Sequence, residues 1–390
     1  MNSSFLSKLR GRFYLAFVTF AFMFSSTNWG FSDDRSGLLV EADLAIGWIS
    51  GSQAPALVTT SDPSTPRDEA GVLSNPTTEI LFGNSLVQTE HRTGGRFRVS
   101  QRLKKEGAFG FYAGAFYLAD GDDDVSFSSN QAGLPILGRP FLNSNTLLPD
   151  AQLVSFPNVL VGQVGVRTAS EVYLGDIGLS TAFIHDQDLE LDLHAGYRYI
   201  AFRDALYIRE NLTSTDSGGV IPMDTTFIVQ DEFSALNQFH GGTLGLSLLN
   251  RAKQWSYGVQ SNVSLGGLVR TLKTSGSTDV TIPGLPTDQY AGGLLALPTN
   301  IGNYTSTKFV AVPEIRLHAN RHITSKLSLN FGYNVLLLPQ TWRAAEQTDL
   351  TVNNSQIGGG TLSGLSRPEF RGASSDIWIQ TLSLGMGINW

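Results

Sequence analysis

The sequence lacks cysteine, is poor in charged residues and contains no apolar run as long as a membrane-spanning helix. Without cysteine, the chain can form neither disulfides nor a thiolate metal site. Charged residues make up 16% of its 390 residues, below the roughly one quarter that is usual for soluble domains. The net charge of -7 argues against nucleic acid as a partner, since nucleic-acid binding needs a basic face. Mean hydropathy is near zero, which argues against a bundle of transmembrane helices.

The N-terminus has the composition of an export signal. Lys8, Arg10 and Arg12 precede an apolar run at 13–24, and small or polar residues follow it. This order is typical of a secretory signal peptide, and about twelve apolar residues are too few to span a bilayer. We therefore predict a signal peptide over 1–32, cleaved after Thr27 or Ser32, and a single domain over 33–390.

The C-terminal stretch shows the clearest alternation of side chains. From residue 382 to the end every second residue is apolar, and the residues between are small or polar. A period of two predicts a β-strand with one apolar face. The stretch ends on Trp390 and is similar to the C-terminal signal strand of bacterial outer-membrane barrels, which the barrel-assembly machinery reads. The alternative is an ordinary edge strand of a soluble β-protein.

Similar strands recur along the chain, joined alternately by short and long connections. Short turns are predicted near 103–106, 185–188, 250–254 and 321–325, and the connections between them are long. Outer-membrane barrels have this pattern, with short periplasmic turns and long external loops. We predict an all-β fold, a transmembrane antiparallel up-and-down β-barrel of about ten strands. The strands are expected at 37–48, 96–102, 108–118, 161–183, 189–204, 236–249, 255–273, 308–320, 327–338 and 375–390.

Aromatic residues fall at the two ends of these strands, where barrels carry girdles at the membrane interfaces. The expected membrane anchors are Trp48, Trp255, Tyr257, Trp378 and Trp390. Pro313 conflicts with the pattern, because proline cannot donate to the ladder and a closed barrel has no edge. We therefore expect a bulge or the barrel rim at this position.

Several stretches resemble the putative beta-barrel porin family seven of bacterial outer membranes. They include 237–245, 294–302, 311–317, 332–335 and 342–349, together with 189–199 and 55–60. The resemblance implies an outer-membrane β-barrel in the Gram-negative cell envelope, with outer-membrane lipid as its surroundings. It implies no catalytic residue and no cofactor, and it leaves the oligomeric state open.

The inward faces of the predicted strands carry charges of both signs. The lumen-lining residues we expect are Glu41, Asp43, Arg96, Arg98, Asp192, His194, Arg198, Arg270, Glu314, Arg316 and His318. Isolated charges in a narrow barrel would be costly, so pairing is expected. About eight strands leave a lumen filled by side chains and about sixteen leave a water channel. The residues thus line a selective passage for small solutes or form a salt-bridged plug in a protein with a structural or surface role.

Other functions are less well supported by the residues. A hydrolase would need Ser, His and an acid together, and no nucleophile-elbow motif frames Ser264 or Ser328 near the inward histidines. We therefore predict that the protein is not an enzyme. The acidic run at 120–124 lacks calcium-loop spacing and is expected to be a solvated loop tip. An exported soluble β-protein or adhesin remains the alternative to a membrane barrel.

Overall fold

The structure is a computed structural model that describes residues 37–103, 109–186 and 188–390. The predicted signal peptide and most of the turn at 103–106 lie outside these residues. Ten long strands pair antiparallel in a ring, which closes where β12 meets β13 and where the first strand meets the last. The predicted ten-stranded all-β barrel is therefore confirmed. The ring consists of β1 (Leu38–Ile49), β6 (Arg92–Arg102), β7 (Phe109–Ser128), β10 (Leu160–His185), β11 (Leu189–Ser214), β12 (Thr226–Ala252), β13 (Trp255–Thr281), β15 (Gly302–His322), β16 (Leu327–Thr341) and β18 (Ser375–Asn389).

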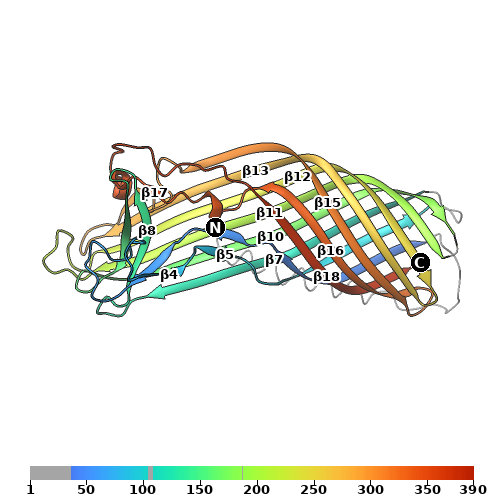
Figure 1. Cartoon of the computed structure of the whole chain (residues 1–390), viewed down its shortest axis with the longest axis horizontal. Helices are drawn as coiled ribbons and strands as arrows, with labels where there is room; N and C mark the ends of the chain where they lie inside the picture. Colours follow the sequence, from blue (N-terminus) through green and yellow to red (C-terminus); the bar gives the residue numbers. More distant parts are fainter. Residues whose placement is uncertain (1–36, 104–108, 187) are drawn as a thin grey trace. The chain divides into compact units, whose positions relative to one another are not determined.

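The wall of the barrel is tall on one side and low on the other. Strands β10 to β13 have 26 or 27 residues each, whereas β6, β1, β18 and β16 have 11 to 15. Figure 1 shows the short strands ending well before their long neighbours. The length of β10 was predicted nearly correctly, whereas β11, β12 and β13 were predicted too short, because their outer parts carry polar residues on both faces. The acidic run at 120–124 accordingly belongs to β7 and not to a loop.

The long connections fold together at the tall side and contain short strands of their own. A five-stranded sheet is formed by β3 (Val58–Ser61), β4 (Thr78–Phe82), β8 (Ile136–Asn143), β9 (Leu148–Ser155) and β17 (Thr351–Val352). Further pieces are β2 (Ser52–Ala54), β5 (Ser85–Val87), β14 (Asp288–Ala291) and the 3₁₀ helices η1 (Ala345–Gln347) and η2 (Asn354–Gly359). We call residues 50–91, 129–159, 282–301 and 342–374 the cap.

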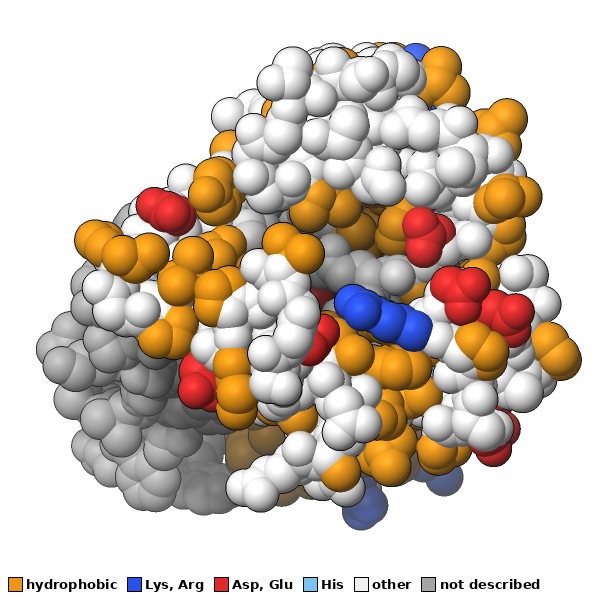
Figure 2. Space-filling view, turned by 90° about the vertical axis from the view of Figure 1, so that its left-hand side faces the viewer, with side chains coloured by type: hydrophobic (Ala, Val, Ile, Leu, Met, Phe, Trp, Pro, Cys, Tyr) orange, Lys and Arg blue, Asp and Glu red, His pale blue; other side chains and the backbone are white. Residues whose placement is uncertain are grey.

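The cap has an apolar core that it shares with the tall wall. Leu57, Leu137 and the run Leu294–Leu297 are buried against inward residues of the wall such as Ile208 and Phe233. Loops normally lie on the surface because their backbone groups need partners. Here the small sheet supplies those partners, so the loops can bury apolar side chains. Figure 2 looks onto this end, where hydrophobic side chains are scattered among the backbone and other side chains drawn in white, with few charged side chains.

Pro313 lies in β15 and its register with β13 is regular, so the predicted bulge or rim position is wrong. The pairing of β15 with β16 runs from His322↔Ser328 to Glu314↔Leu336 and stops there. Pro313 is thus the first residue of β15 without a partner on the β16 side. The ladder with β16 thus ends at the position where the missing N–H of Pro313 would have donated.

Candidate functional site

The candidate site is the lumen of the barrel, which the inward residues of β11 cross from one end to the other. Read from the short-turn end, these residues are Glu190, Asp192, His194, Arg198, Ile200, Phe202, Asp204, Leu206, Ile208 and Glu210. All ten are buried or partly buried. Polar, apolar, polar, apolar and again polar layers follow one another, and each layer continues on the neighbouring strands. Alternation along a strand places every second residue inside, so the sequence of β11 encodes the order of the layers.

Glu314 is the centre of the first charged layer. Its carboxylate lies 2.8 Å from Arg198 and 3.9 Å from Arg96, and it accepts a hydrogen bond of 3.0 Å from Asn262. Arg198 also reaches Asp176 of the neighbouring strand at 3.5 Å. Glu314 and Arg198 are only 5% and 4% exposed, so neither charge is screened by bulk water. The attraction between them therefore acts at close range in a low-dielectric setting.

A second set of contacts ties β1 to the far side of the same layer. Arg316 lies 3.3 Å from the carboxylate of Asp43, and Asn330 donates to both Glu41 and Asp43. Arg98 bonds the side-chain oxygen of Gln260 at 3.3 Å. These contacts join strands on opposite sides of the ring, so the layer spans the lumen.

Nearer the short turns, Glu190 is the centre of another cluster. Arg251 contacts one of its oxygens at 2.5 Å, and Arg102 contacts the other. Arg102 also lies 2.7 Å from Asp192. Charges of opposite sign therefore alternate across this end of the lumen, as the expected pairing requires.

The charged layer encloses one small cavity. It has a volume of about 30 Å³, lies among Arg96, Arg198, Glu314 and Arg316, and has room for about two water molecules. It is far smaller than the several hundred Å³ of a typical ligand pocket. The space can hydrate the buried charges but is too small for a solute.

The next layer is apolar and crosses the whole barrel. Its buried members are Ala45, Ile49, Phe116, Leu118, Val172, Ile200, Phe202, Phe239, Leu268, Val310, Val312, Leu336, Leu338, Ile377 and Ile379. They come from nine of the ten strands and from both the tall and the low side. An ion that enters such a layer loses its hydration, at a cost on the order of tens of kcal/mol when nothing replaces it. The layer is therefore a barrier to ions in this conformation.

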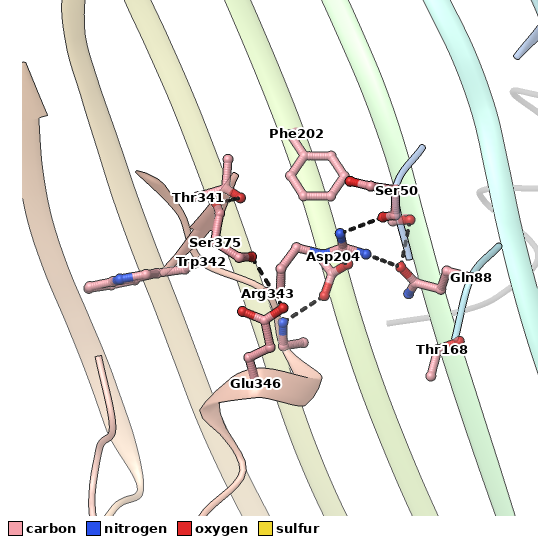
Figure 3. Close-up of polar contacts among 12 residues, drawn as sticks. Ser50, Gln88, Thr168, Phe202, Asp204, Thr341, Trp342, Arg343, Glu346 and Ser375 are labelled. Atoms are coloured by element: carbon pink, nitrogen blue, oxygen red, sulfur yellow. Dashed lines mark hydrogen bonds and ion pairs between the residues drawn. The ribbon is translucent and has the colours of Figure 1, made fainter. Parts of the chain in front are cut away.

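Above the apolar layer, the cap inserts Arg343 into the barrel. Its guanidinium contacts Asp204 at 2.9 Å and donates to the Ser50 carbonyl and to the Gln88 side chain, as Figure 3 shows. The other oxygen of Asp204 accepts from the backbone N–H of Ala344 at 2.6 Å. Arg343 and Asp204 are each 1% exposed. A single carboxylate thus holds both the side chain and the backbone of the inserted segment.

Wall residues also hold the backbone on the other side of Arg343. Asn237 accepts from the N–H of Trp342 and donates to its carbonyl, at 2.7 and 2.9 Å. Arg270 donates to the Gln340 carbonyl, and its guanidinium lies 4.7 Å from the centre of the Trp342 ring. These contacts fix the segment around Arg343 inside the barrel, and its side chains fill the upper lumen.

Buried ion pairs fix the rest of the cap to the tall wall. Arg139 of β8 lies 2.5 Å from Glu210 and 2.8 Å from Asp231, and all three side chains are 1% exposed or less. Asp231 also accepts from the backbone N–H groups of Leu295 and Ala296. Two separate cap segments therefore depend on neighbouring carboxylates of β11 and β12.

The sequence-predicted lumen residues fall into distinct groups in the structure, which places all eleven on the inner side. Arg96, Arg198 and Glu314 form one cluster and Asp43 with Arg316 another, while Arg270 lies apart beneath the cap. Arg139 and Arg343 were missed because they come from loops. The stretch 342–349 was singled out in the sequence for its family resemblance, without a predicted position.

The residues considered for hydrolysis do not come together. Ser264 bonds Thr243, Ser328 bonds Asn330, and His194 lies edge-on to Tyr112. Ser256 and His322 are 2.8 Å apart at the short-turn end, and among the described residues no ion pair joins His322 to a carboxylate. A triad needs such a carboxylate.

The outer surface carries a continuous apolar band bordered by aromatic side chains. Leu44, Leu244 and Leu384 are among its members, each at least 56% exposed. All five expected anchors lie on the outer face, with Trp48 and Trp378 at one border and Trp255, Tyr257 and Trp390 at the other. Exposed apolar area of this extent is rare on soluble monomers and usual on lipid-facing barrels.

Among the residues that the structure describes, no helix is both long and apolar enough to cross a membrane.

Comparison with known proteins gives one family and several distant folds. The family model described as "Putative beta barrel porin-7" (BBP7) matches residues 39–390. No curated protein matches the chain. The outer membrane protease OmpT from Escherichia coli is 10% identical with a TM-score of 0.40, over 94% of this chain and 99% of that one. The Pseudomonas aeruginosa FadL homologue is 8% identical with a TM-score of 0.23, over 91% and 90%. Values this low carry no activity over to the chain.

Proposed function

Because the chain belongs to the Putative beta barrel porin-7 family and has an outer-membrane β-barrel fold, we propose that it is a closed barrel of the bacterial outer membrane. Its role is to anchor and display the cap at the cell surface, and it does not conduct solutes along its axis in this conformation. The observation that carries the proposal is the filled lumen, in which a charged layer, an apolar layer and Arg343 follow one another.

Passive passage of small solutes is the second candidate, and it depends on whether the charged layer is a plug or a lining. Support for the plug comes from the cross-lumen pairs of Glu314, which join strands on opposite sides of the ring. Support for the lining would be a large current through the wild-type protein. The two roles therefore differ in a quantity that can be measured directly.

Arg198→Ala tests the proposal in one variant. Loss of this guanidinium leaves Glu314 buried with the 3.9 Å contact to Arg96 and the hydrogen bond from Asn262, so unfolding should become easier by about 3–5 kcal/mol, less if water enters. Arg203→Ala is the matched control, because Arg203 lies on the outer face of the same strand, is 60% exposed and forms an ion pair of little value.

The measurements are conductance in planar bilayers and unfolding in detergent. We expect little current through the wild type and a loss of stability confined to Arg198→Ala. A large, steady and charge-selective wild-type current, together with unchanged stability of Arg198→Ala, would refute the closed barrel and support passage of solutes.

A further inference from the structure

The junction between β15 and β16 is incomplete over part of its length, and the incomplete part is defined by sequence. The last pair on this side is Glu314↔Leu336. Beyond it β15 continues to Gly302, paired only with β13, and β16 continues to Thr341, paired only with β18. In the described part of the chain, no complete ladder pair joins the two strands above this one.

Two prolines account for the end of the pairing. His322 N–H bonds the Gln254 carbonyl, so even-numbered residues of β15 point their backbone groups at β13 and odd-numbered residues point theirs at β16. The next two hydrogen-bonded pairs of the ladder would be 313 with 337 and 311 with 339. Pro313 removes the N–H from the first and Pro339 removes it from the second. Each strand thus carries one proline at a position that would have donated across this junction.

The open stretch has apolar side chains on both faces. Outside, Phe309, Ala311 and Pro313 of β15 are exposed, with Phe309 at 77%. Inside, Val310 and Val312 of β15 pack in the same apolar layer as Leu336 and Leu338 of β16. We call residues 309–313 and 336–339 the window. Side-chain contacts matter more for its closure than in a complete ladder, because each of the two proline-containing pairs can form at most one of its two hydrogen bonds.

The window has a defined lower and upper limit. The Glu314↔Leu336 pair and the charged layer lie below it. Above it, Arg270 donates to the Gln340 carbonyl of β16 at 2.9 Å and to the Ser306 hydroxyl of β15 at 2.8 Å. One guanidinium therefore bridges the two separated strands. Between these limits the inward side chains of both strands are apolar.

The window lies at the outer border of the apolar band. Leu337 pairs with Trp378, one of the aromatic residues at that border, and Pro313 lies next to it across the junction. An orphan N–H is costly in lipid, and a proline has none to leave unpaired. The prolines therefore make separated strands less costly at the depth where lipid meets the wall.

We propose that the window is a lateral gate through which a small apolar molecule dissolved in the outer leaflet reaches the apolar layer of the lumen. The molecule replaces the contacts of Val310 and Val312 with Leu336 and Leu338, and fewer backbone hydrogen bonds have to break here than in a complete ladder. Arg270 is a positioning residue that limits how far the strands separate. A barrel that is closed to ions along its axis is compatible with this gate, because the apolar layer can take up apolar molecules and excludes ions.

The absence of cysteine allows the gate to be locked by a single disulfide. Val312→Cys with Leu338→Cys would bridge the window, because these positions continue the register of the formed ladder. Ala319→Cys with Phe331→Cys is the matched control, because it bridges a pair that is already formed in the same junction. The probe is the fluorophore N-phenyl-1-naphthylamine, titrated into proteoliposomes that contain each variant, in its oxidised and its reduced form.

We expect the oxidised window variant to bind the probe with at least tenfold lower apparent affinity than the wild type, and to recover that affinity on reduction. The control pair should match the wild type in both its oxidised and its reduced form. Pro313→Val with Pro339→Val should lower probe binding in the same direction, and Arg270→Gln should increase it. Equal binding by the locked and reduced window variants, or no specific binding by the wild type, would overturn the gate. Ion conductance is recorded separately, so failure of the closed barrel and failure of the gate are distinguishable.

Discussion

Arg139→Ala should release the cap from the wall, because this guanidinium lies between two buried carboxylates. Glu210 and Asp231 are both fully buried beside it, at 2.5 and 2.8 Å. Breaking a buried pair typically costs about 3–5 kcal/mol. Glu210 keeps a bond from Gln152 and Asp231 keeps two backbone N–H donors, so we expect a loss near the lower limit, about 3 kcal/mol. That loss raises the population of the detached cap about a hundredfold.

The loss of stability in Arg139→Ala should depend on pH, and the burial of Glu210 determines the direction of that dependence. Burial raises the pKa of Glu210, against the opposing attraction of Arg139. Without the arginine that carboxyl is freer to hold a proton in the folded state, and stability is then lost as pH rises through its pKa. The destabilisation of Arg139→Ala should therefore shrink as pH falls, and Arg139→Met with Glu210→Gln should recover part of it.

The assay is limited proteolysis of the cap together with urea unfolding in detergent, since the cap can open without the barrel. Arg209→Ala is the control, because Arg209 is exposed on the outer face next to Glu210, and its loss should stay within about 0.5 kcal/mol. Equal protection of the cap in the two variants would show that the buried pair does not hold it.

Three further predictions concern the membrane, the C-terminus and the cap. The protein should stay with carbonate-washed membranes and change its gel mobility on boiling, and its release as a soluble species would contradict the barrel. Deletion of Trp390, or Trp390→Asp, should lower the amount of assembled barrel without blocking export, because Trp390 bonds Leu38 where the ring closes. Unchanged assembly would show that the last strand is not an assembly signal. Burial raises the pKa of Glu346, so its contribution to stability should decline as pH rises through that pKa. Unfolding curves of Glu346→Gln should lack this decline, and a decline of equal size would assign it to another group.

The ring of strands could be predicted because each strand faces lipid on one side and side chains on the other. This contrast gives the alternation at 382–390 and in Leu38–Ile49, and pairing of those two strands closes the barrel. The contrast disappears where a strand leaves the membrane. Arg203 and Asp204 are successive polar residues of β11, one exposed and one buried, so periodicity predicted the end of that strand too early.

The inward charges could be predicted for the same reason, but their partners could not. Arg198 and Glu314 are 116 residues apart, and only the shape of the closed ring brings them together. Arg139 and Arg343 come from segments without periodicity, and their positions are set by contacts with the tall wall. The proline in β15 was recognised as an anomaly, but the second proline, at 339, gained its meaning only from the register.

The apolar core that the cap loops share limits which of these loops can be replaced. Loops from four different parts of the chain meet in that core, so replacing one of them removes support from the others. The hairpin at 215–225 is different, because in the described chain it contributes none of the buried residues of that core, and its tip residue Val220 is fully exposed. The ladder between β11 and β12 continues up to Thr213↔Thr226, next to this tip, and fixes its base. A foreign peptide grafted at 217–221 would be carried on a rigid two-stranded arm, while the rest of the surface kept its fold.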